Sequence, residues 1–270
     1  MLRVQALLCL AAAMIAAPMA TGAIRQDHRS LLLNPTAPEF HTRAPNRAIV
    51  RLDTSVGTID IEVIRAWAPH GADRFVALAR HGYYDDARFF RVRPGRWVQF
   101  GINGDPAIAQ AWRNQTLPDD PFVQSNTRGT VAFAFAVPNG RTTQVFVNTG
   151  DNSSTHDKEP FTPFGRVVSG MANVDAVNAE YGEGPGGIRA GKQDPFFDGG
   201  NAWLFREFPR LDFIRRATIR AASPAGQRTG SRGTPVPVIS TEAMEPSALN
   251  LSSSMHTTLE LRSFSPSGRR

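Results

Sequence analysis

Alternating apolar and polar positions recur along the middle of the chain and predict a series of short β-strands. The clearest case is TIDIEV at residues 58–63, where every second residue is aliphatic and the others are polar, as in a strand that buries one face. A run at 48–53 precedes it across a turn that contains Ser55 and Gly57, so the two runs predict a hairpin. Further strands are expected at 88–93, 97–101, 130–136, 143–148, 163–168 and 211–219.

Helical spacing is visible in two segments. Pro69 suits the first turn of a helix, the apolar positions 72, 75, 78 and 79 form one stripe, and Gly82 is a suitable C-cap. A second helix is expected from Met171 to Tyr181, followed by a Gly-rich loop at 182–200. Many strands, two helices and no regular alternation between them predict a mainly β fold, either a largely antiparallel barrel or a sandwich.

The N-terminal residues 1–23 have the pattern of a secretory signal peptide. Arg3 is followed by an apolar stretch at 6–20 and by small residues at 20–23. The stretch is shorter than the roughly 20 residues of a typical spanning helix, so we expect no stable membrane span after cleavage. A retained membrane anchor is the alternative. The expected location is the secretory pathway, in the periplasm, the endoplasmic reticulum lumen or the extracellular space.

The rest of the chain divides by composition. Residues 24–45 are polar and proline-containing and are interpreted as a linker, whereas residues 46–220 contain the strands and helices of one folded domain. The last 50 residues, 221–270, hold 10 Ser, 5 Pro and one aromatic residue. Such a composition cannot bury enough apolar surface to offset chain entropy, so we expect a disordered tail.

Composition and charge exclude several classes of protein. The 270 residues include one cysteine, Cys9, which excludes an intramolecular disulfide framework and a multi-cysteine metal site. The net charge of +6 is spread evenly, with +2 in each of the segments 1–45, 46–220 and 221–270. Because no segment concentrates the charge along a phosphate-tracking stripe, we expect no binding of nucleic acid. The six histidines are scattered and are interpreted as solvated loop residues.

The most unusual stretch is FFRVRPGRWVQFG at residues 89–101. It predicts a strand, a Pro-Gly turn and a second strand, with an arginine inside the first. Alternation places Phe89 and Arg91 on one face of that strand. Taken alone, Arg91 could be a solvated arginine on the surface of the sheet.

A second stretch, GTVAFAFAVPNGRTTQVFVN at residues 129–148, combines small and large residues. Its alternating alanines at 132, 134 and 136 leave one face small enough for a peptide backbone to approach closely. Gln144 and Phe146 share one face of the next strand. Taken alone, this stretch is an ordinary hairpin with Phe146 in the core.

Together, and in this order, these stretches resemble the cyclophilin family of peptidyl-prolyl isomerases. The resemblance covers residues 48–219 and rests on F-x-R-x-x-P-G-x-x-x-Q at 89–99, A-x-A at 134–136, Q-x-F at 144–146 and F-G-R-V at 164–167. The tracts GINGDP, SNTRGT and EFPRLD look like a bacterial-type branch. The resemblance implies a closed antiparallel eight-stranded barrel with two capping helices, and an enzyme that isomerises X-Pro bonds in polypeptides.

The resemblance also implies a set of site residues. Arg91 matches the family's catalytic arginine, Gln99 its backbone-binding glutamine and Phe146 the floor of its proline pocket. The residues expected to support this pocket or to contact the substrate are Phe89, Phe90, Trp97, Ala134, Phe135, Ala136, Gln144 and Phe161. No cofactor or metal is expected, the partners are proline-containing polypeptides, and the chain is expected to be a monomer.

Departures from the family pattern leave other functions open. Arg96 stands where the family has a pocket-lining aromatic residue, and Phe135 stands where it has a backbone-binding asparagine. A second hypothesis is therefore a proline-peptide binding or scaffold module of low activity. A third is that the tail at 221–270 is the active partner segment and the barrel only holds it.

Overall fold

The computed structural model describes residues 28–187 and 192–220, all of which belong to one compact unit. The expected signal peptide at 1–23 and the expected tail at 221–270 lie outside the described residues.

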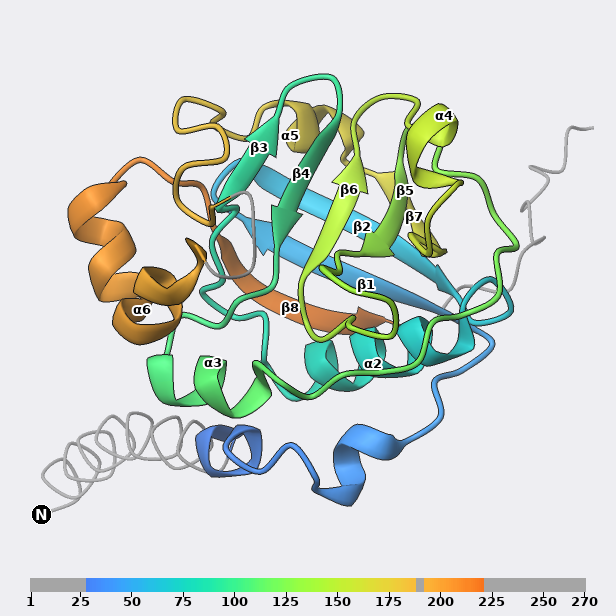
Figure 1. Cartoon of the computed structure of the whole chain (residues 1–270), viewed down its shortest axis with the longest axis horizontal. Coiled ribbons are helices and arrows are strands. Elements are labelled where there is room, and N and C mark those ends of the chain that lie inside the picture. Colours follow the sequence, from blue (N-terminus) through green and yellow to red (C-terminus); the bar gives the residue numbers. More distant parts are fainter. Residues whose placement is uncertain (1–27, 188–191, 221–270) are drawn as a thin grey trace, which may run out of the picture. The chain divides into compact units, whose positions relative to one another are not determined.

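Eight antiparallel strands form one strongly curled sheet (Figure 1). The strands are β1 (Arg47–Thr54), β2 (Gly57–Ile64), β3 (Arg91–Arg93), β4 (Trp97–Phe100), β5 (Thr130–Phe133), β6 (Val145–Asn148), β7 (Pro163–Ser169) and β8 (Ile214–Arg220). Their order across the sheet is β3-β4-β6-β5-β7-β2-β1-β8. Inward-facing aliphatic and aromatic residues, such as Val50, Ile61 and Phe133, are fully buried and form the main core.

The sheet closes on itself where its two outer strands meet. Arg88, just before β3, forms an antiparallel bridge with Phe213, just before β8. The Phe89 N–H donates to the Asp212 carbonyl at 2.9 Å, and the Ile214 N–H donates to the Ala87 carbonyl at 2.9 Å. The expected eight-stranded antiparallel fold is therefore confirmed, as a curled sheet whose two outer strands are joined through one residue pair.

All eight expected strands are present, but several are shorter than the sequence pattern predicts. The strand expected at 88–93 is regular only from Arg91, because the chain before it leaves the sheet to make the closing bridge. The strand expected at 130–136 ends at Phe133, and the expected strand 143–148 begins at Val145. Hairpin patterns predict pairing well, but tertiary contacts decide where pairing stops.

The helix predicted from Pro69 is present as α2 (Pro69–Arg80), and it packs against β1, β2, β7 and β8. The second predicted helix is much shorter, since α5 spans only Met171–Asp175 and packs against β2. Within residues 46–220, three helices were not predicted: α3 (Pro106–Trp112), α4 (Ser153–His156) and α6 (Asp194–Glu207). Helix α6 begins inside the expected Gly-rich loop and is kinked at Gly200, whose φ of 54° is in the left-handed region.

Helices α3 and α6 lie side by side next to the barrel (Figure 1). They enclose a second apolar cluster, which contains Phe90, Ile102, Phe196, Phe197 and Leu204.

Residues 28–45, expected to belong to a linker, pack against helices α2 and α3 instead. Residues 28–32 are helical, and Pro38–His41 form the 3₁₀ helix η1. Phe40 is buried with its ring centroid 4.8 Å from that of Trp112, and the Trp112 indole N–H donates to the Leu32 carbonyl at 2.8 Å. This part of the chain therefore belongs to the folded unit. The sequence did not predict this, because only a few apolar residues make the contacts and they follow no regular period.

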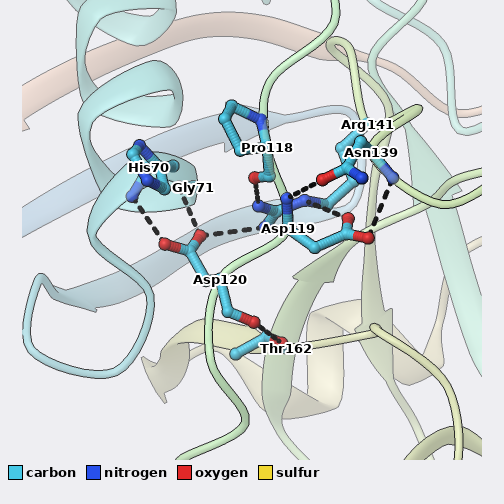
Figure 2. A network of polar contacts seen from close by, with 8 residues as sticks. All are labelled: His70, Gly71, Pro118, Asp119, Asp120, Asn139, Arg141 and Thr162. Atoms are coloured by element: carbon cyan, nitrogen blue, oxygen red, sulfur yellow. Dashed lines mark hydrogen bonds and ion pairs between the residues drawn. The ribbon is translucent and has the colours of Figure 1, made fainter.

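A buried ion pair fixes two loops to the first turn of α2 (Figure 2). The side chains of Asp120 and Arg141 are both fully buried, and the Arg141 guanidinium donates to the Asp120 carboxylate at 2.9 Å. The same carboxylate accepts the backbone N–H groups of His70 at 2.8 Å and Gly71 at 2.9 Å. Asp120 thus caps a helix whose own N-cap residue, Ala68, has no side-chain acceptor.

The Asp120→Asn variant should lower the free energy of unfolding by about 3 kcal/mol, because it removes the fully buried carboxylate that pairs with the buried Arg141 guanidinium and leaves only the longer contact to Asp119 at 3.3 Å. Urea denaturation followed by circular dichroism measures this change. The matched control is Glu180→Gln, which removes the carboxylate of the exposed Glu180–Arg210 ion pair and should cost clearly less than Asp120→Asn. Equal losses in the two variants would contradict a structural role for the buried pair.

Candidate active site

Strand pairing places Arg91 directly opposite Gln99 in the hairpin formed by β3 and β4. The other edge of β3 is covered by the turn at 181–187, since the Val92 N–H donates to the Gly182 carbonyl at 2.8 Å. This contact brings Glu183 beside Arg91, and the Arg91 Nε donates to Glu183 Oε1 at 2.8 Å. Glu183 was not predicted, because nothing in the Gly-rich pattern around it indicates that the turn lies along β3.

The guanidinium of Arg91 contacts three different side chains. Its Nη2 lies 2.5 Å from Glu183 Oε1, and its Nη1 donates to Gln99 Oε1 at 3.1 Å. Its central carbon lies 5.2 Å from the centroid of the Trp97 ring. The Arg91 side chain keeps 18% of its surface exposed and that of Glu183 keeps 23%. Arg91 is therefore oriented towards Trp97 and is not a solvated surface arginine.

A chain of hydrogen bonds between side-chain amides leads away from Arg91. The buried Gln99 donates through Nε2 to Gln144 Oε1 at 2.9 Å, and Gln144 donates through Nε2 to Gln193 Oε1 at 2.9 Å. Gln99 and Gln144 were both predicted as site residues, and the structure brings them together. Gln193 was not predicted, since it lies just before α6 in the segment interpreted as a loop.

An aromatic cluster adjoins these polar groups. Its buried members are Trp97, Ala132 and Phe146, and Ala134 and Phe161 pack against them. The Phe146 and Phe161 rings meet edge to face with centroids 5.6 Å apart, and the Phe135 ring lies 4.3 Å from Phe161. The structure therefore brings the predicted residues Trp97, Phe146, Phe161, Ala134 and Phe135 into one place. Their apolar side chains lie beside the guanidinium of Arg91 and the amides of Gln99 and Gln144.

His156, interpreted from the sequence as a solvated loop residue, belongs to this aromatic cluster. Its ring centroid lies 5.5 Å from that of Trp97, 5.4 Å from Phe146 and 4.6 Å from Phe161. It reaches the cluster from the end of α4, a helix of four residues without a sequence signal.

Backbone contacts hold the β3–β4 turn against the segment that carries His156. The Arg96 carbonyl accepts the Thr149 N–H at 3.0 Å and the Asn152 side-chain amide at 2.7 Å. A Cβ on Gly150 would lie 2.1 Å from the Gly95 carbonyl oxygen, so only glycine allows this close approach.

Three predicted site residues lie outside the cluster. Phe89 packs in the main core against Phe100, with ring centroids 5.6 Å apart, because the chain before Arg91 is irregular and does not place Phe89 on the face of Arg91. Phe90 lies in the second apolar cluster, 5.4 Å from Phe196 between ring centroids. Ala136 is exposed, because β5 ends before it.

Burial lowers the pKa of His156 below its usual value, and the positive charges of Arg96 and Arg91 lower it further. The nearby carboxylate of Asp157 opposes this effect and raises the pKa. The net shift favours a neutral imidazole among the aromatic rings at pH 7.

Within residues 28–187 and 192–220, no three His, Cys, Asp or Glu side chains are arranged to hold a metal ion. No helix in the same ranges is long and apolar enough to cross a membrane.

Acidification should destabilise the protein through His156. Its folded pKa is lowered, so below about pH 6.5 the unfolded chain binds more protons than the folded one, and the free energy of unfolding falls as the pH falls. His156→Phe removes this titration and should lose less stability between pH 7 and pH 5 than the wild type. Urea denaturation at intervals of pH measures the difference, and identical pH dependence in both proteins would contradict the assignment.

Comparisons with known proteins identify the family of the chain. The family model described as "Cyclophilin type peptidyl-prolyl cis-trans isomerase/CLD" matches residues 49–191. A peptidyl-prolyl cis-trans isomerase of Acinetobacter baylyi is 31% identical over 137 residues, which cover 48% of this chain and 71% of that protein. Peptidyl-prolyl cis-trans isomerase-like 3 of Dictyostelium discoideum is 29% identical over 134 residues, which cover 47% of this chain and 80% of that protein.

Among solved structures, a cyclophilin type isomerase of Cryptosporidium parvum aligns with a TM-score of 0.49 and 17% identity, over 66% of this chain and 99% of that one. The relatives named here come from organisms as different as Acinetobacter baylyi and Dictyostelium discoideum, so the bacterial-type branch stays a prediction. The family model covers more than half of the chain, and the chain therefore belongs to the cyclophilin-type peptidyl-prolyl cis-trans isomerase family.

Proposed function

We propose that this protein catalyses cis-trans isomerisation of X-Pro bonds in polypeptides of the secretory pathway. The observation that carries the proposal is the position of Arg91. Its guanidinium lies beside the aromatic cluster, 5.2 Å from the Trp97 ring centroid, and is hydrogen-bonded to Gln99. Membership of the family supports the same reaction.

The reaction needs no proton transfer and no covalent intermediate. Resonance stiffens the peptide C–N bond, so an X-Pro bond rotates across a barrier of about 18 to 20 kcal/mol. In the twisted transition state the prolyl nitrogen becomes pyramidal and its lone pair localises. A guanidinium that donates to this nitrogen, or to the neighbouring carbonyl, stabilises the twisted state more than either planar state, which lowers the barrier.

The surrounding groups fit this role. Phe146, Trp97 and Phe161 supply an apolar surface against which the pyrrolidine ring can be held while the acyl side rotates. The amides of Gln99 and Gln144 can exchange their mutual hydrogen bond for bonds to the peptide backbone.

The compartment rests on the sequence alone. Residues 1–23 have the early positive charge, the short apolar stretch and the small residues at the end that are typical of a signal peptide. A chain exported by this signal would meet unfolded clients whose prolyl bonds isomerise in tens of seconds or longer without catalysis.

A second candidate is a proline-peptide binding module with little turnover. The ion pair between Arg91 and Glu183 favours it, because a carboxylate already occupies one edge of the guanidinium. Arg96 and Phe135, at positions where the sequence departs from the family pattern, are further support. Peptide binding without acceleration of isomerisation would favour this candidate.

Arg91→Ala should lower kcat/KM for a proline tetrapeptide by about 100-fold, because loss of one preorganised donor to a transition state typically has an effect of this size. A protease-coupled assay that cleaves only the trans isomer measures the rate.

Arg80→Ala is the matched control. It removes an arginine from the exposed face of α2 and should keep wild-type activity. Equal rates for the wild type and Arg91→Ala would exclude the proposed mechanism.

A further inference from the structure

Three arginines surround one indole ring at the edge of the site. The guanidinium carbons of Arg91, Arg93 and Arg96 lie 5.2, 4.8 and 5.9 Å from the centroid of the Trp97 ring. We propose that Arg93 and Arg96 form an anion-binding subsite that selects clients with an acidic residue next to the isomerised proline. This inference rests on the proposed function, whose substrate class it specifies.

The three cations differ in their partners. Arg91 is paired with Glu183, whereas Arg93 and Arg96 have no carboxylate within ion-pair distance among the described residues. The Nε of Arg96 is buried and has no hydrogen-bond acceptor in the same part of the chain. The Arg96 guanidinium therefore has no carboxylate of the described chain that an incoming carboxylate would have to displace.

The nearby carboxylates are already engaged elsewhere. Asp157 accepts hydrogen bonds from the Ser125 hydroxyl and from the backbone N–H and side-chain amide of Asn126. Asp151 accepts the Ser153 N–H. These bonds hold both carboxylates in the loop that carries α4, and neither forms an ion pair with Arg96. The charge of Arg96 nevertheless reaches the aromatic cluster, since it contributes to the lowered pKa of His156.

The position of Arg96 is fixed by its backbone. Its carbonyl accepts hydrogen bonds from Thr149 and Asn152, so the side chain starts from a rigid point beside Trp97. Arg93 pairs with Trp97 in the β3–β4 register and is exposed at the rim. If a peptide places its prolyl ring on the aromatic cluster, the residues next to that proline therefore lie close to Arg93 and Arg96. A carboxylate there can accept from a guanidinium in bidentate geometry, whereas a lysine would be repelled.

The test uses the complete protein and matched peptides that carry Glu, Gln or Lys immediately before or after one proline. Both kcat/KM and the dissociation constant are measured. At one or both positions, we expect the Glu peptide to exceed the Gln peptide about threefold to tenfold in kcat/KM and in affinity, and the Lys peptide to be the poorest. The preference should shrink at about 0.5 M salt, since exposed charges are screened.

Variants then assign the preference to the two arginines. Arg96→Gln should bring the Glu-to-Gln ratio close to one, and Arg93→Gln should reduce it by a smaller factor. Arg80→Gln, with the same loss of charge on α2, should keep the wild-type ratio.

The outcomes separate this inference from the proposed function. Equal turnover and affinity for Glu and Gln peptides in the wild type would overturn the subsite while leaving the isomerase in place. If no peptide is turned over, the proposed function fails, and the dissociation constants alone decide the subsite: tighter binding of Glu peptides supports it and equal binding excludes it.

Discussion

The site depends on holding one guanidinium in place while leaving it able to donate. Arg91 is oriented by Glu183 on one edge, by Gln99 on another and by the face of Trp97. A completely buried ion pair would hold the guanidinium too tightly for its partner to be exchanged. The side chains of both partners keep part of their surface exposed, 18% and 23%, so their attraction is weaker than that of a fully buried pair.

The barrel supplies the rigidity that this arrangement requires. Arg91 and Gln99 face each other because β3 and β4 are paired, and Gln99 lies opposite Phe146 because β4 and β6 are paired. The register of the sheet therefore places Arg91, Gln99 and Phe146 next to one another on three neighbouring strands. The loops at the rim need a different kind of support, and the buried carboxylate of Asp120 provides it for two of them at the start of α2.

The sequence predicts those parts of the site that lie on strands, because period-2 patterns and family motifs both apply there. Arg91, Gln99 and Phe146 are in this group, and Gln144 directly precedes β6. Glu183, Gln193 and His156 reach the site from turns and a four-residue helix, where no periodicity links a residue to its position in space. Helix α6 was missed for a related reason: two consecutive glycines interrupt it, and they are typical of a loop.

The outer strands of the sheet are joined through fewer residue pairs than the strands inside it, which affects how the protein unfolds. Strands β1 and β2 are joined over eight residue pairs, whereas β3 and β8 meet only through Arg88 and Phe213. Local opening on heating should begin at this narrow seam, since few bonds must break there. The strand that separates first is β3, which carries Arg91. Activity would therefore be lost at a lower temperature than the one at which the rest of the barrel unfolds. Inactivation and global denaturation would then have different midpoint temperatures.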